Sequence, residues 1–156
     1  MSTVNPAPRF ITHVFLGGTV DSTYRDRFTE AIGKCELSIK PEIFNPIVPD
    51  WTPEHMILEM EAKERSEIQV FAITPAHTGF FTFIEIMDAA IKHPNKKVFV
   101  TFLTDEGEWT DAQKKSNWAI LNVLRGYKNV LATTGDVTAL AGNVAFALNQ
   151  QFGTRD

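Results

Sequence analysis

The sequence predicts a doubly wound α/β fold, in which helices cover both faces of a parallel sheet. Short apolar runs alternate along the chain with longer segments whose apolar residues recur at helical spacing. The chain has 156 residues, of which 44% are hydrophobic and 22% are charged. This length and composition are typical of a single domain with one core. Repeated strand and helix units around one sheet are therefore expected.

Five apolar runs are the expected strands, and a helix is expected after each of them. The strands are predicted at residues 13–16, 42–45, 68–74, 97–103 and 129–132. The helices are predicted at residues 24–34, 53–65, 80–92, 111–125 and 137–151. This pattern fits a five-stranded flavodoxin-like sheet with the strand order 2-1-3-4-5. We expect residues 1–10 to be a flexible segment and residues 11–156 to form the single domain.

Capping residues support the predicted helix ends. Thr52 followed by Pro53 is typical of a helix start, and Asp136 is in position to cap the last helix. Gly126 and Gly153 stand where helices are expected to stop. The helix at residues 80–92 is apolar almost all round, which predicts a central, buried helix.

Composition argues against several classes of partner. Fifteen Lys and Arg residues against nineteen Asp and Glu give a net charge of -4, so no cationic surplus is available to bind duplex nucleic acid. The apolar run at residues 98–103 is far shorter than the roughly 20 residues of a membrane span, and residues 1–10 lack the apolar core of a signal peptide. We expect no membrane association and a cytoplasmic location.

The cysteine and histidine content predicts neither a disulfide nor a metal site. Cys35 is the single cysteine, and the four histidines are scattered. None of them has the close spacing of zinc ligands. We expect no metal and no cofactor.

The first candidate ligand segment follows the first predicted strand. Ligands of open parallel sheets bind at the carboxyl ends of the strands, where the strand order reverses. Gly17 and Gly18 would let a ligand approach the backbone, and Thr19 and Asp21 would offer polar side chains at a helix start. The alternative is a tight turn in which Asp21 or Ser22 caps the next helix.

The second candidate segment follows the second predicted strand. Two prolines stiffen a loop that displays Asn45, Asp50 and Trp51. An amide, a carboxylate and an indole together could bind a heterocyclic base by edge contacts and stacking. The alternative is that Trp51 packs on the apolar face ahead of the next helix.

The third candidate segment runs from Gly79 into the following helix, where Thr82 and Glu85 share one side. A carboxylate on a buried helix near the ligand edge should be partly desolvated, as catalytic carboxylates often are. The alternative is a capping box, since Thr82 and Glu85 have the required spacing. Glu59 on the preceding helix belongs by pattern to a solvated acidic face, with Glu61 and Glu64.

Taken together, these segments resemble the nucleoside 2-deoxyribosyltransferase-like family. The matching pieces are residues 14–21, residues 43–46 with Asp50 and Trp51, the acidic helix with Glu59, and residues 79–89 with Glu85. The resemblance implies a flavodoxin-like enzyme acting on the N-glycosidic bond of nucleosides. It implies Glu85 as the nucleophile and Glu59 as a group that holds the sugar or handles protons. It also implies a base and sugar pocket along the loops at Gly17 and Asn45, and a homo-oligomer.

The expected reaction is a two-step displacement at the anomeric carbon of a nucleoside or nucleotide. Glu85 would form a deoxyribosyl ester, which a second base would attack in a transferase and water in a hydrolase. Asp21, Asp50 and Glu59 are candidates for the general acid. Two alternatives stay open: a hydrolase of nucleoside monophosphates, anchored at Ser22 and Arg25, and a catalytically inactive nucleotide-binding module.

Overall fold

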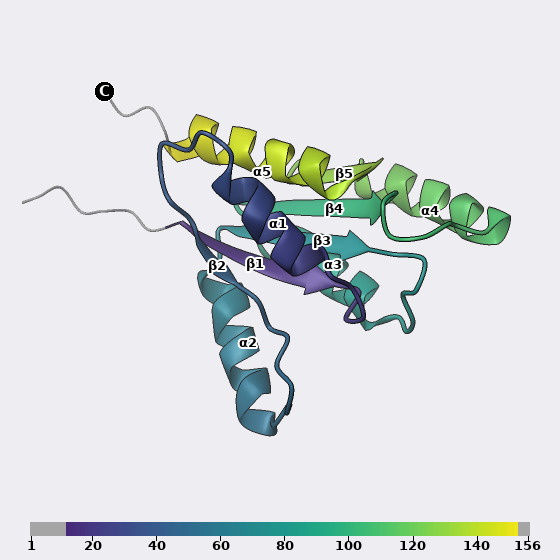
Figure 1. Ribbon diagram of the computed structural model, residues 1–156, viewed down its shortest axis with the longest axis horizontal. Helices are drawn as coiled ribbons and strands as arrows, with labels where there is room; N and C mark the ends of the chain where they lie inside the picture. Colours follow the sequence, from purple (N-terminus) through teal and green to yellow (C-terminus); the bar gives the residue numbers. More distant parts are fainter. Residues whose placement is uncertain (1–11, 153–156) are drawn as a thin grey trace, which may run out of the picture.

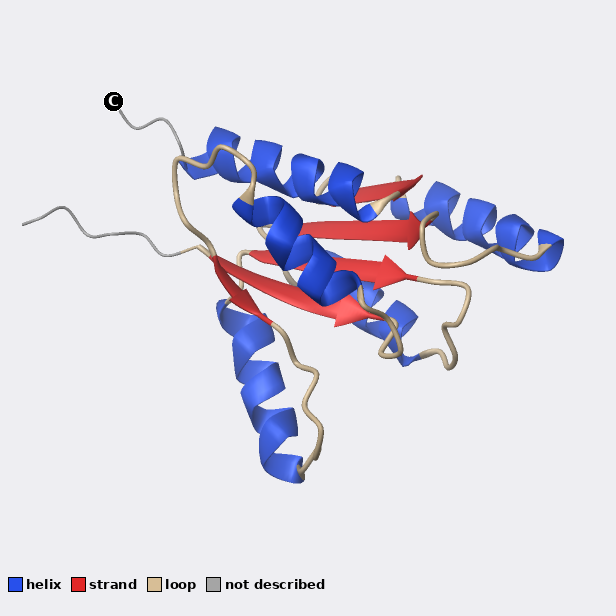
Figure 2. Cartoon of the chain, viewed as in Figure 1, coloured by secondary structure: helices blue, strands red, loops and turns tan. Residues whose placement is uncertain are grey.

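The computed structural model describes residues 12–152, which form a five-stranded parallel sheet with helices on both faces (Figures 1 and 2). The strands are β1 His13–Gly18, β2 Glu42–Phe44, β3 Ile68–Ile73, β4 Lys97–Leu103 and β5 Val130–Gly135. The helices are α1 Tyr24–Gly33, α2 Pro53–Arg65, α3 Phe81–Lys92, α4 Asp111–Leu124 and α5 Val137–Phe152. The strand order is β2-β1-β3-β4-β5, which confirms the predicted flavodoxin-like topology. The expected flexible segment at residues 1–10 and the expected helix stop at Gly153 lie outside the described residues.

Two strands extend further than the apolar runs predicted. β1 includes Gly17 and Gly18, which pair with Phe71 and Ala72 of β3. β5 continues to Gly135, which pairs with Leu103 of β4. Glycine and threonine interrupt an apolar pattern, but the ladders to neighbouring strands hold these residues in the sheet.

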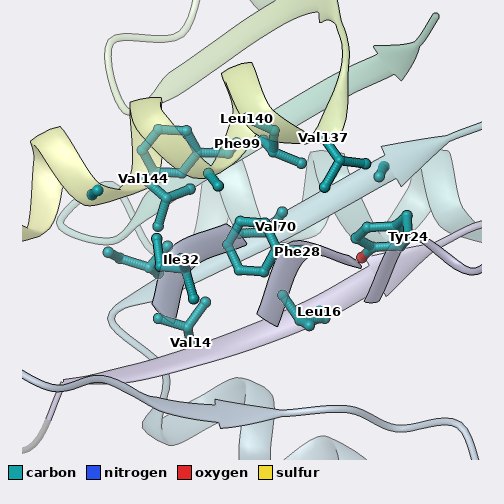
Figure 3. Packing of buried hydrophobic residues seen from close by; sticks show 14 of the residues in the cluster. Val14, Leu16, Tyr24, Phe28, Ile32, Val70, Phe99, Val137, Leu140 and Val144 are labelled. Atoms are coloured by element: carbon teal, nitrogen blue, oxygen red, sulfur yellow. The ribbon is translucent and has the colours of Figure 1, made fainter. Parts of the chain in front are cut away.

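One face of the sheet is covered by α1 and α5, which enclose the larger core. Its side chains interlock between the two helices and the strands β1, β3 and β4 (Figure 3). The labelled members are Val14, Leu16, Tyr24, Phe28, Ile32, Val70, Phe99, Val137, Leu140 and Val144. This burial supplies the apolar free energy that closes the first face.

The other face carries α2, α3 and α4, and these helices cover it unequally. Ile86 of α3 and Leu121 of α4 pack on a row of strand phenylalanines that includes Phe71 and Phe102. α2 buries only Ala62. The N-terminal part of α2 extends away from the sheet (Figure 1).

The prediction that α3 is a central, buried helix is wrong. Thr82, Ile86, Ala89 and Ala90 are buried, but Ile84 and Ile91 are 62% and 61% exposed. A helix that is apolar on all sides needs a covering for each side. The sheet covers one side of α3, and no other element of residues 12–152 covers the outer side.

The structure confirms two of the three predicted helix N-caps, those of α2 and α5. Thr52 is the N-cap of α2 with Pro53 in the first turn, and Asp136 Oδ1 accepts a 2.7 Å hydrogen bond from the Ala139 amide at the start of α5. α1 begins differently, because Thr23 is its N-cap in place of the expected Asp21 or Ser22. Ser22 still contributes, since its Oγ accepts a 3.1 Å bond from the Tyr24 amide.

No helix within residues 12–152 is both long and apolar enough to cross a bilayer. The expected cytoplasmic location stays a prediction.

Candidate active site

The first candidate segment begins where β1 and β3 end side by side. Gly18 has a φ of 105°, and a Cβ placed on it would lie 2.0 Å from the carbonyl oxygen of Ala72. A Cβ on Gly17 would lie 2.6 Å from the ring of Phe71. The two glycines thus let β1 and β3 approach each other closely. Atoms of β3 fill the space that a side chain would need at these two positions. The packing of the strands therefore explains why both residues are glycine, without any ligand.

Thr19 ties the loops after β1 and β3 together. Its buried Oγ accepts a 3.0 Å hydrogen bond from the Thr74 amide and lies 2.9 Å from His77 Nδ1. His77 lies in the loop after β3, and its ring meets the ring of Phe83 edge-on, with 5.7 Å between the ring centres. Burial lowers the pKa of His77 below its ordinary value. The Thr19 hydroxyl therefore stabilises the loops of the site.

Glu85 and Glu59, the two predicted catalytic residues, are brought together by a lysine. Lys63 Nζ binds a carboxylate oxygen of Glu85 and lies 3.5 Å from Oε1 of Glu59. Only 14% of the Glu85 side chain and 23% of the Lys63 side chain are exposed. The Lys63 ammonium also lies 5.3 Å from the Phe15 ring centre and 5.8 Å from that of Phe81, within cation–π range.

Glu85 does not belong to a capping box, so that alternative is wrong. The N-cap of α3 is Phe80, and Thr82 is a buried residue inside the first turn. Gly79, with a φ of 84°, makes the turn that leads into the helix. This start places Glu85 one turn into α3, where it meets Lys63.

Burial raises the pKa of Glu85 above its ordinary value of 4.5. The Lys63 ammonium opposes this rise through its hydrogen bond and its charge, and the Glu59 carboxylate adds to it. Arg25 also stabilises the charged form from further away. A carboxylate held in a partly desolvated position beside a second carboxylate has the environment of a nucleophile or a proton carrier.

Lys63 is the site residue that sequence reasoning missed. It stands four residues after Glu59, and this spacing is typical of an ion pair on a helix face. The signal was present, but the acidic residues around it indicated a solvated face. The Lys63 side chain turns instead toward α3.

The predicted ligand residues of the loop after β2 do not contact Glu59 or Glu85. Asn45 Oδ1 accepts a 3.0 Å bond from the Ile47 amide, so this side chain closes its own turn. Asp50 and Trp51 are exposed, which contradicts the alternative that Trp51 packs ahead of α2. Within residues 12–152, no hydrogen bond or ion pair joins Asn45, Asp50 or Trp51 to the glutamates. Asp21 is exposed as well.

The start of α1 is already occupied by a carboxylate of the protein. Glu106, in the loop after β4, accepts hydrogen bonds from Ser22 Oγ at 2.7 Å and Thr23 Oγ at 3.2 Å. Arg27 pairs with Glu106 and with Asp105, the latter at 2.7 Å. These contacts fill the place that a helix N-terminus would offer to a phosphate.

Arg25, the other expected phosphate anchor, is buried and fully engaged. Its guanidinium donates to the carbonyl oxygens of Leu16, Gly18 and Thr19, at 3.3, 3.4 and 2.8 Å. It also lies over the ring of Tyr24 at 4.8 Å. Arg25 therefore holds the end of β1 and does not present a free guanidinium.

No protein-family model matches this chain. No curated protein matches it either. The strongest arrangement is the cluster of Glu59, Lys63 and Glu85 beside the ring of Phe15 of β1, on the face of the sheet that α2 and α3 cover.

Proposed function

We propose that the protein is an enzyme that cleaves or transfers at the N-glycosidic bond of nucleosides, with Glu85 as the nucleophile. The observation that carries the proposal is the placement of Glu85. Its side chain is mostly buried, lies one turn into α3 and is held by Lys63 next to Glu59. The resemblance of the surrounding segments to the nucleoside 2-deoxyribosyltransferase-like family supports the same reaction.

In the first step, a carboxylate oxygen of Glu85 attacks the anomeric carbon of the sugar. A new C–O ester bond forms as the C–N bond breaks, and the base leaves with the electron pair of that bond. Glu59 is the candidate that donates a proton to the leaving base. Of the three acids considered, only Glu59 lies against the Lys63–Glu85 pair.

In the second step, water or another base attacks the same carbon and releases Glu85. Glu59 takes up the proton that the attacking molecule loses, so the protein returns to its starting state. Lys63 favours the charged form of the Glu85 carboxylate before the attack and again after its release. It also offsets the burial that favours the neutral form.

We further propose that the substrate is a nucleoside and not its 5'-monophosphate. Glu106 places a negative charge at the start of α1, and Arg25 is engaged with backbone carbonyls. A phosphate at this position would have to displace the Glu106 carboxylate from Ser22, Thr23 and Arg27.

The test is chromatography of the protein incubated with 2'-deoxynucleosides and their 5'-monophosphates, with and without a second free base. We expect release or exchange of the base, which Glu85→Gln abolishes. The matched control is Asp88→Asn on the same helix, since Asp88 is an exposed partner of Lys92 at 3.1 Å. Asp88→Asn should keep full activity.

The second candidate is a nucleotide-binding module without turnover, which the engagement of the Glu85 carboxylate by Lys63 favours. This module would be stabilised against heat by a nucleoside or nucleotide without converting it. Turnover by the native chain that disappears in Glu85→Gln would contradict the proposal of a binding module. Thermal stabilisation by a nucleoside or nucleotide without any product would contradict the proposal of an enzyme.

A further inference from the structure

A pocket of about 260 Å3 lies between α5 and the first residues of β4 and β5. Phe99 of β4 and Leu131 of β5 line it, and because these two residues are paired in the sheet, their side chains point to the same face. Phe99 belongs to the core beneath α5 (Figure 3). The pocket is therefore on the face of the sheet opposite to Glu59, Lys63 and Glu85.

One side of α5 forms a wall of this pocket. Asn143, Phe146, Ala147 and Gln150 recur at intervals of three, one and three residues, so they share one side of the helix. Val144 and the other buried residues of α5 lie on the side that packs on the sheet. The wall thus has a ring and a methyl group at its centre and an amide at each end.

The apolar part of the pocket is exposed because β5 is the last strand of the sheet. Leu131 is 44% exposed although it points to the face that α5 covers, and Phe146 is 63% exposed. α5 packs on α1 and on β4, so it leaves the edge at β5 partly open. A ligand ring in this space would remove both side chains from water.

Two lysines line the pocket, and no acidic residue does so. Lys97 begins β4 and lies two residues before Phe99, hence on the same face of the sheet. Lys128 stands two residues before β5. Within residues 12–152, neither lysine pairs with a carboxylate. The whole chain has a net charge of -4, yet the charge at this pocket is positive and attracts an anion.

We propose that this pocket binds a small aromatic carboxylate, with its ring against Phe146 and Leu131 and its carboxylate at Lys97 and Lys128. The volume is below the roughly 300–1,000 Å3 of pockets that hold drug-sized ligands, which favours a one-ring compound over a nucleotide. A bare phosphate would leave the apolar side chains in water. The inference is independent of the proposed reaction.

The test is titration of the full chain with phenylacetate, followed by NMR through the backbone amide signals. We expect saturable shifts at Leu131 and Phe146 with a Kd below about 5 mM. Phenylacetamide has the same shape without the charge, and acetate has the charge without the ring. Each should bind at least about fivefold more weakly than phenylacetate, because each lacks one of the two contacts.

Substitutions in the pocket test the two contacts separately. Lys97→Gln and Lys128→Gln should each raise the Kd about threefold, a modest effect because water screens charges near the surface. Phe146→Ser should raise it at least about threefold through the loss of the ring contact. Lys115→Gln is the matched control, since Lys115 is an exposed lysine of α4 outside the pocket and should leave the Kd unchanged.

Four results would overturn the proposal. They are a Kd above about 5 mM, equal binding of phenylacetamide, a Kd that both pocket lysine variants leave unchanged, and shifts at Gly79 and Glu85 in place of those at Leu131 and Phe146. The last result would place the ligand at the candidate active site. Loss of nucleoside turnover, by contrast, bears on the proposed reaction and not on this pocket.

Discussion

The ammonium of Lys63 on α2 binds the carboxylate of Glu85 on α3. Both side chains are mostly buried, and the ammonium lies near the rings of Phe15 and Phe81. α2 buries little else against the sheet, so this ion pair fixes the end of α2 beside α3. It also opposes the rise that burial causes in the pKa of Glu85, the residue that we propose as nucleophile.

Replacement of Lys63 by methionine should move the acid limb of the kcat/KM profile to higher pH. Burial already raises the pKa of Glu85, and Lys63 opposes the rise by stabilising the carboxylate. Loss of the ammonium therefore raises the pKa further, so that a higher pH is needed to ionise the nucleophile. Lys92→Met is the control, because Lys92 pairs with Asp88 on the exposed side of α3. An unmoved limb, or a shift to lower pH, would contradict the role assigned to Lys63.

Glu85 should also make stability depend on pH in a defined direction. Its folded-state pKa lies above the ordinary value of 4.5, so the protonated form is favoured in the folded protein. The stability that this contributes is fully present below about pH 4.5 and is lost as the pH rises through the folded-state pKa. Urea unfolding of the native chain and of Glu85→Gln isolates this effect, because glutamine does not titrate. The native chain should lose stability relative to the variant across that pH range, and a relative gain would be evidence against a raised pKa.

Glu106 should select against a 5'-phosphate. If the substrate is a nucleoside, kcat/KM for the 2'-deoxynucleoside should exceed that for its 5'-monophosphate by at least about tenfold, which needs only about 1.4 kcal/mol of like-charge repulsion. Glu106→Gln should narrow this ratio, since it removes the charge that Ser22 and Thr23 bind. Glu108→Gln changes an exposed glutamate two residues along the same loop and should leave the ratio as it was. Preference of the native protein for the monophosphate would refute this assignment.

Two glycine substitutions should change stability in opposite directions. Gly18→Ala forces a side chain into a φ of 105° and against the carbonyl of Ala72, and should cost about 3 kcal/mol or more. Gly142→Ala fills open space on the exposed side of α5 and should add about 0.5–1 kcal/mol. Both values come from urea denaturation curves. A harmless Gly18→Ala would mean that β1 and β3 do not approach as closely as described.

The order of the elements could be predicted from the sequence because it depends on local patterns. Apolar runs and capping residues such as Thr52 and Asp136 act within a few residues, and the parallel sheet follows from their alternation. The ends of β1 and β5 could not be predicted in the same way. Gly17 and Gly135 belong to strands only because a neighbouring strand pairs with them.

The environment of α3 could not be predicted for a related reason. The sequence pattern shows that a residue such as Ile84 is apolar, but it does not show whether the sheet covers that residue. The site was partly predictable, since Glu85 and Glu59 were identified as candidates and the structure brings them together through Lys63. Lys63 was missed, because its spacing from Glu59 indicates an ion pair on one helix and does not show that its side chain also reaches Glu85 on α3.

The mass of the protein during turnover shows whether Glu85 becomes covalently attached to the sugar. The protein would be mixed with a 2'-deoxynucleoside, quenched in acid and analysed as an intact chain and as peptides. A nucleophilic Glu85 predicts a deoxyribosyl adduct on the peptide that contains Glu85, absent from Glu85→Gln and present in Asp88→Asn. Release of the base without an adduct on Glu85, or with an adduct on another residue, would contradict the assignment of Glu85 as the nucleophile.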